Sequence, residues 1–81
     1  MGKIQIFVKT NKGKNFNIQL EGTETIGQIK SLIEKKEGTT VENQMLIFRG
    51  KSLVDDSLTV KDVGIQKNNQ LKLVTKLLGG F

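Results

Sequence analysis

The 81 residues allow one compact domain, and its stability must come from an apolar core because no cysteine is present to form a disulfide and no histidine to help bind a metal. The missing histidine and cysteine also exclude most nucleophilic catalysis, so we expect no catalytic residues, no metal and no cofactor. Thirteen basic against eight acidic residues give a net charge of +5, but the lysines are scattered and no tyrosine or tryptophan can stack on bases, which argues against nucleic-acid binding.

The first two elements are predicted to form a β-hairpin. Residues 3–10 alternate between apolar side chains and other side chains at every second position, the period of a half-buried strand. A polar segment with one glycine follows at 11–14, and residues 15–20 then alternate in the same way. Two such strands joined by a short polar turn indicate a hairpin.

A helix is predicted over residues 26–37. Thr25 and Gln28 have the spacing of a capping box, in which the two side chains accept hydrogen bonds from backbone N–H groups at the start of a helix. Gly38 can adopt the left-handed conformation that ends one. Leu32 lies at the edge of the apolar face, which consists of three isoleucines: Ile26, Ile29 and Ile33.

The second half of the chain contains two further strands. Residues 45–48 form a short strand that leads into a turn at 49–52, and residues 70–77 alternate as a last strand. The stretch between them is predicted to be irregular and to send three side chains into the core: Leu53, Val60 and Ile65. This order predicts an α+β fold, with a mixed sheet of four to five strands and one main helix packed on one face.

Adjacent carboxylates are the remaining candidates for acid–base chemistry. Asp55 and Asp56 form the one such pair in the chain. Because they stand before Ser57 in a predicted turn, we interpret them as residues that cap and solvate that turn.

The strands at 45–48 and 70–77 carry more apolar side chains than can face the core. A strand that buries Leu46 on one face must turn Ile47 to the other face. Burying Leu71 and Leu73 likewise turns Val74 outward, beside Lys72. An apolar pair rimmed by lysines is typical of a binding patch, and scattered surface residues without a role are the alternative.

The segment 77–81 is predicted to be a tail to the domain formed by residues 1–76. It reads Leu77-Leu78-Gly79-Gly80-Phe81, with no polar side chain to anchor it and two glycines that disfavour a fixed conformation. Fully extended, the chain from Lys76 to Gly80 spans roughly 17 Å. Such a tail can enter a narrow catalytic channel and present an unhindered glycine carbonyl, and the alternative is an ordinary frayed terminus.

Several short motifs together resemble ubiquitin, in register. They are Gln5-Ile6-Phe7-Val8-Lys9-Thr10, Lys36-Glu37-Gly38, Leu46-Ile47-Phe48, Gly50-Lys51, Ile65-Gln66-Lys67 and Gly79-Gly80. The resemblance covers about residues 4 to 80, with one extra residue within 54–58. It implies the β-grasp fold of the ubiquitin family.

The resemblance also implies a reaction that other proteins carry out on this one. An activating enzyme would adenylate the Gly80 carboxylate, and conjugating and ligase enzymes would transfer it through a thioester to lysine amines of target proteins. Because Phe81 follows Gly80, a processing protease would first remove Phe81. The alternative is a non-conjugating interaction module in which Phe81 is permanent and docks on the surface.

The resemblance assigns roles to individual residues. Ile47 and Val74 match the receptor-binding patch of ubiquitin, in which Asn11 and Lys72 here replace a leucine and a histidine. Tail recognition falls to Lys76, Leu77 and Leu78, where the tail of ubiquitin carries arginines at the first and last of these positions. The candidate chain-linkage lysines are Lys51, Lys67, Lys14, Lys9, Lys30 and Lys36.

No part of the sequence predicts a membrane span or a secretion signal. A span needs about 18 apolar residues, and the longest apolar run is the four residues 45–48. The N-terminus lacks a basic start followed by an apolar stretch. We therefore expect the protein to be located in the cytoplasm and nucleus. We also expect it to be a monomer.

Overall fold

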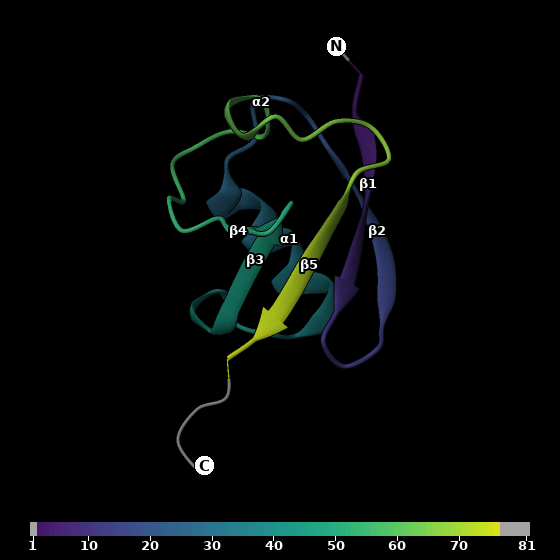
Figure 1. Cartoon of the computed structure of the whole chain (residues 1–81), viewed down its shortest axis with the longest axis vertical. Coiled ribbons are helices and arrows are strands. Elements are labelled where there is room, and N and C mark those ends of the chain that lie inside the picture. The colour runs from purple at the N-terminus through teal and green to yellow at the C-terminus, as the bar shows by residue number, and fades with distance from the viewer. Residues whose placement is uncertain (1, 77–81) are drawn as a thin grey trace.

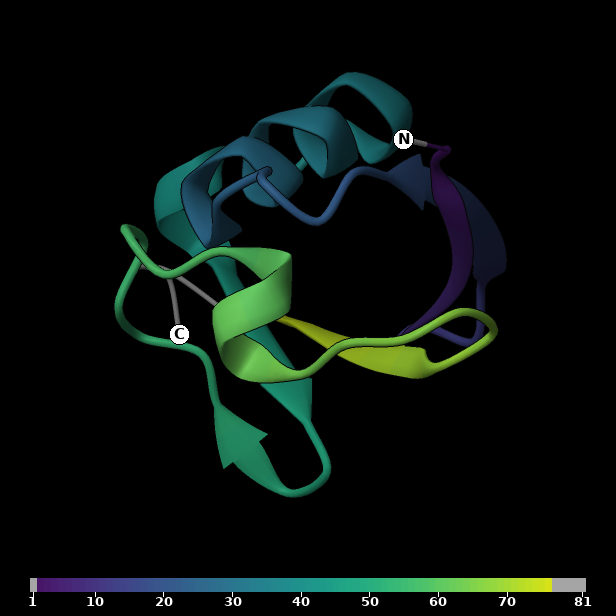
Figure 2. The same ribbon diagram turned by 90° about the horizontal axis from the view of Figure 1, so that it is seen from above.

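The structure, a computed structural model, describes residues 2–76 and contains one five-stranded sheet with a helix across one face (Figure 1). The strands lie in the order β2-β1-β5-β3-β4, and β1 and β5 run parallel while the other neighbours are antiparallel. Figure 2 shows helix α1 above the curved sheet. The elements are β1 (Ile4–Thr10), β2 (Asn15–Leu20), α1 (Ile26–Glu37), the 3-10 helix η1 (Val41–Asn43), β3 (Gln44–Phe48), β4 (Lys51–Ser52), α2 (Val60–Val63) and β5 (Gln70–Thr75).

The predicted hairpin is confirmed, with β1 beginning at Ile4 instead of Lys3. The Thr10 side chain holds the turn, because its hydroxyl oxygen accepts hydrogen bonds from the backbone N–H groups of Lys12 and Lys14 at 3.2 and 3.0 Å. Gly13 has a φ of 86°, which a side chain would disfavour. Local turn chemistry therefore fixes the register in which β1 and β2 bury their apolar face.

Helix α1 has the predicted bounds and the predicted caps. The Thr25 hydroxyl accepts a hydrogen bond from the Gln28 backbone N–H at 3.2 Å, and the Gln28 side-chain oxygen accepts one from the Thr25 backbone N–H at 2.8 Å. At the other end Gly38 has a φ of 83° and donates its N–H to the Glu34 carbonyl. The helix therefore begins and ends where its sequence requires.

The core lies between α1 and the inner face of the sheet. Val60 and Ile65 enter it as predicted, whereas Leu53 is only partly buried at its edge. The buried apolar residues are Ile6, Val8, Ile18, Leu20, Ile26, Ile29, Ile33, Leu46, Phe48, Val60, Ile65, Leu71 and Leu73. The β-grasp fold predicted from the sequence is therefore confirmed.

Between residues 2 and 76, no helix has the length and apolarity needed to cross a membrane.

The turn predicted over residues 49–52 is shorter than expected. Only Arg49 and Gly50 form it, and both have positive φ, at 53° and 81°, as a two-residue type I′ hairpin turn requires. The next two residues form β4, where Lys51 pairs with Phe48 and Ser52 with Ile47. A two-residue turn therefore replaces the predicted four-residue turn.

The stretch predicted to be irregular contains the short helix α2. The Thr59 hydroxyl accepts the Asp62 backbone N–H at 3.0 Å, the Asp62 carboxylate accepts the Thr59 backbone N–H at 3.0 Å, and Gly64 ends the helix in the left-handed conformation. The Thr-x-x-Asp spacing followed by a glycine is the sequence signal that could have predicted this helix. Element η1 was also not predicted.

The last strand ends earlier than the prediction of 70–77. Strand β5 ends at Thr75, and the Lys76 N–H still donates to the Asn43 carbonyl at 2.7 Å, in the same register as the pairing of Thr75 with Gln44. Leu77 lies outside the described residues. The body of the domain is thus tied together up to Lys76.

Candidate functional site

The face of the sheet opposite α1 brings the predicted patch residues together. In the strand register Lys72 of β5 lies between Lys9 of β1 and Ile47 of β3, and Val74 pairs with Met45. Ile47 and Val74 are therefore diagonal neighbours on two adjacent strands, close enough for their side chains to form one surface. This face carries the candidate receptor site and is called the outer face below.

Burial along β3 follows the predicted alternation. Leu46 is fully buried, and Ile47 is partly exposed on the outer face, as Val74 is on β5. The most exposed large apolar side chain on this face is instead Phe7, at 39%, which pairs with Gln70. Phe7 was missed as a candidate, although its position in the alternation of residues 3–10 already turned it outward.

Asn11 links the first hairpin to β5 at the edge of the outer face. Its backbone N–H donates to the Leu73 carbonyl at 3.0 Å, and its side-chain oxygen accepts the Thr75 N–H at 3.3 Å. The predicted patch residue therefore lies beside Val74. Its side-chain oxygen is already used, and within residues 2–76 its side-chain N–H groups donate no hydrogen bond, so these groups are what it can offer a partner.

The charged residues within the five strands are all positive. All eight acidic residues of the chain lie outside the five strands, whereas the strands carry three lysines. Of these, Lys9 and Lys72 are exposed neighbours on the outer face. Two neighbouring ammonium groups give the surface beside the apolar pair a positive potential. The strand lysines are Lys9, Lys51 and Lys72.

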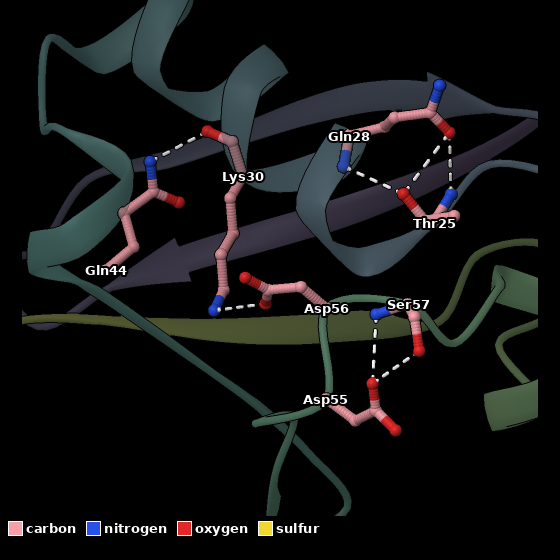
Figure 3. A network of polar contacts seen from close by, with 7 residues as sticks. All are labelled: Thr25, Gln28, Lys30, Gln44, Asp55, Asp56 and Ser57. Atoms are coloured by element: carbon pink, nitrogen blue, oxygen red, sulfur yellow. Dashed lines mark hydrogen bonds and ion pairs between the residues drawn. The ribbon is translucent and has the colours of Figure 1, made fainter.

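The candidate linkage lysines differ in access. Lys30 is only 8% exposed, and its ammonium Nζ lies 2.9 Å from the Asp56 carboxylate, as Figure 3 shows. Lys14 is exposed and lies 3.7 Å from Glu37. The remaining candidates are all exposed: Lys9, Lys36, Lys51 and Lys67.

The two adjacent aspartates have different roles. Asp55 caps its turn as predicted, accepting the Ser57 hydroxyl at 2.6 Å and the Ser57 backbone N–H at 3.0 Å (Figure 3). These hydrogen bonds, the one from the hydroxyl first, hold the pKa of Asp55 below its usual value. Asp56 does not serve the turn, because its carboxylate pairs with Lys30, 26 residues away in sequence. The expectation that both residues cap the turn was wrong for Asp56.

The tail residues predicted for conjugation, Gly79, Gly80 and Phe81, lie outside the described residues, as do Leu77 and Leu78. Of the predicted tail-recognition residues only Lys76 is described, and it is exposed. Within residues 2–76, histidine, cysteine, aspartate and glutamate side chains do not gather in a group of three that could hold a metal ion.

Comparison with known proteins identifies the family. Residues 6–78 match the model of the ubiquitin family. The chain is 44% identical over 73 residues to the NEDD8-like protein RUB1 of Saccharomyces cerevisiae, covering 90% of this chain and 94% of that protein. It is 42% identical over 77 residues to the NEDD8-like protein RUB3 of Arabidopsis thaliana (95% and 97%) and 40% identical over 76 residues to the ubiquitin-like protein NEDD8 of Dictyostelium discoideum (94% and 97%). The chain therefore belongs to the ubiquitin family of ubiquitin-like protein modifiers, which confirms the resemblance that its sequence motifs indicated.

Proposed function

We propose that this protein is covalently attached to target proteins through the carboxylate of Gly80. The observation that carries the proposal is a β-grasp domain whose last strand ends at Thr75 and is followed in the sequence by Lys76-Leu77-Leu78-Gly79-Gly80. Glycine offers the least hindered carboxylate of any residue, and the tail before it has no charged side chain after Lys76. The relatives named NEDD8-like support this reading.

Conjugation requires that the bond between Gly80 and Phe81 is first hydrolysed. Water adds across this amide, leaving a free carboxylate on Gly80 and releasing the amino group of Phe81. An activating enzyme then joins the carboxylate to AMP with release of pyrophosphate from ATP, and a cysteine thiolate displaces AMP to form a thioester. A lysine amine of the target displaces the thiol and forms the amide. The chemistry belongs to these enzymes, and the modifier supplies the carboxylate and the surfaces that they bind.

The outer face is the proposed receptor site. Ile47 and Val74 would provide the apolar contact, and Lys72 and the Asn11 amide would contact polar groups around it. Because Lys72 and Lys9 are neighbours, receptors with acidic residues are favoured over neutral ones, and their affinity should fall as salt is added.

The candidate linkage lysines differ in how exposed their side chains are, and this exposure sets how readily each could be modified. Lys51 and Lys67 are exposed, so their amines can reach an incoming thioester without a change of structure. Lys30 would first have to leave Asp56 and the surrounding core. We therefore propose that chains, where they form, use an exposed lysine and not Lys30.

The test is thioester formation. The Gly80-ended form should give a complex with an activating enzyme that depends on ATP and is broken by a reducing agent, and the full chain ending in Phe81 should give none until a protease has removed Phe81. Gly80→Ala serves as the matched control because it keeps a carboxylate but adds a methyl group beside it. The alternative, a non-conjugating interaction module, predicts no thioester from either form together with retention of Phe81 in lysate of the source cells.

A further inference from the structure

A groove lies between the β3–β4 hairpin and α2, away from the outer face. Its volume is about 240 Å³, and it is lined by Phe48, Arg49, Lys51, Leu53 and Val63. Phe48 belongs to the inner row of β3, on the opposite side of the strand from Ile47. The groove is therefore separate from the proposed receptor site. It is also smaller than the roughly 300–1,000 Å³ that is usual for small-molecule sites, and suits a single large side chain.

The lining combines an apolar floor with a basic rim. Phe48 belongs to the buried core and Leu53 and Val63 pack against that core, while Arg49 and Lys51 are exposed. None of the five described lining residues is acidic. An apolar hollow with two cations at its edge fits a ligand that carries an apolar group beside negative charge.

The rim cations are not neutralised by the domain itself. Among residues 2–76, neither Arg49 nor Lys51 takes part in an ion pair. The aspartates that follow in sequence have other partners: Asp55 accepts from Ser57, Asp56 pairs with Lys30, and Asp62 caps α2. The positive charge at the rim is thus available to a partner.

Arg49 also holds a backbone conformation that its side chain disfavours. Its φ is 53°, at a turn position where asparagine, aspartate or glycine is preferred. Its guanidinium Cζ lies 5.0 Å from the centre of the Phe48 ring, and this cation–π contact holds the charge beside a residue that lines the groove. An arginine at a strained turn position, in contact with an aromatic ring that lines a groove, is the kind of local departure that indicates a functional contact.

We propose that this groove binds a short acidic peptide segment of a partner protein, in which an aromatic or aliphatic side chain is flanked by carboxylates. The apolar side chain rests on Phe48, Leu53 and Val63. One carboxylate forms a paired hydrogen bond with the Arg49 guanidinium, and a second contacts the Lys51 ammonium. This site does not depend on attachment of Gly80 to a target, although it shares Lys51 with the candidate linkage lysines.

The test uses blocked peptides and amide resonances. The probe is acetyl-Glu-Asp-Phe-Asp-Glu-amide, together with the same peptide carrying leucine in place of phenylalanine, each titrated to millimolar concentration into the labelled 81-residue chain. The control peptide replaces each acid with its amide. We expect amide chemical-shift changes that centre on five residues: Phe48, Arg49, Lys51, Leu53 and Val63. The control peptide should bind at least about tenfold more weakly, because it cannot form the charge-assisted hydrogen bonds.

Two variants separate this groove from the outer face. Arg49→Asn removes the guanidinium at a position that favours asparagine, so the fold is retained and affinity for the acidic peptide should fall about tenfold. Ile47→Ala changes the opposite side of β3 and should leave the peptide affinity unchanged. The proposal is overturned if neither acidic peptide binds, if the amide control binds equally well, or if Arg49→Asn has no effect. It is also overturned if a single-stranded oligonucleotide shifts these residues and the peptides do not.

Discussion

Replacing Asp56 by asparagine should destabilise the domain through a residue that is itself half exposed. The Lys30 side chain is 11% exposed and the Asp56 side chain 54%, with 2.9 Å between ammonium and carboxylate. Asparagine keeps the shape of the side chain and the backbone carbonyl that accepts the Gly27 N–H at 3.1 Å. What it removes is the charge that compensates a largely buried ammonium.

The magnitude follows from the unequal burial of the two partners. A hydrogen bond to a charged group contributes about 1.5–3 kcal/mol, and solvent around the exposed carboxylate reduces this to about 1–2 kcal/mol here. Lys30→Met is the matched comparison, because it removes the ammonium and leaves no buried charge behind. We expect it to change the free energy of unfolding by less than about 1 kcal/mol.

Urea unfolding followed by circular dichroism at neutral pH measures both variants and the double variant. In the double variant, Asp56→Asn should add almost nothing to the effect of Lys30→Met, since the ammonium that needed compensation is gone. A parallel readout is acetylation by a lysine-reactive reagent, which should modify Lys30 last in the native chain and faster after Asp56→Asn. Charge compensation by Asp56 is contradicted if Lys30→Met is the more destabilising change, or if Asp56→Asn alters neither stability nor acetylation.

Three other predictions follow from burial and local chemistry. Leu46→Ala truncates a fully buried side chain and should cost about 2–5 kcal/mol in urea unfolding, whereas Ile47→Ala, on the partly exposed side of β3, should cost about 1 kcal/mol; the reverse order would mean that the face assignment is wrong. Gly27→Ala should raise stability by about 0.5–1 kcal/mol, because a methyl group there meets Asp56 Cβ at an ordinary 3.4 Å and alanine favours a helix; a lower melting temperature would contradict this. Because the pKa of Asp55 is lowered in the folded state, its contribution to stability is present above the usual pKa of 3.8 and is lost as the pH falls through the lower folded value. Ser57→Ala should move the pKa of Asp55, measured by NMR of the carboxyl carbon, back toward 3.8. An unchanged pKa would show that the Ser57 hydroxyl does not cause the lowering.

Local signals in the sequence were sufficient for the elements that make the core. Alternation gave the β1–β2 hairpin, and the Thr25–Gln28 box with Gly38 gave both ends of α1. The same alternation turned Ile47 away from the core, because facing in a strand is decided by neighbours one residue apart. That Ile47 and Val74 lie side by side depends on the pairing of β3 with β5, which the alternation of each strand does not determine.

What the sequence did not predict depends on contacts between distant residues. Lys30 and Asp56 are 26 residues apart, and nothing near either one indicates the pair. The Lys76 N–H, just after β5, is held by the carbonyl of Asn43 in η1, a residue distant in sequence. The groove likewise exists only because the fold brings the β3–β4 hairpin beside α2. Each of these features follows from tertiary packing and not from a local pattern.

The proposed attachment of Gly80 to target lysines is tested most directly by mass spectrometry of conjugates. The tagged 81-residue chain is expressed in its source cells, purified under denaturing conditions and digested with trypsin. Because the last basic residue is Lys76, cleavage there leaves Leu77-Leu78-Gly79-Gly80 on any modified lysine. We predict target lysines that carry this four-residue branch, and none from cells expressing Gly80→Ala. Recovery of the tagged chain with Phe81 intact and of no branched peptide would contradict conjugation.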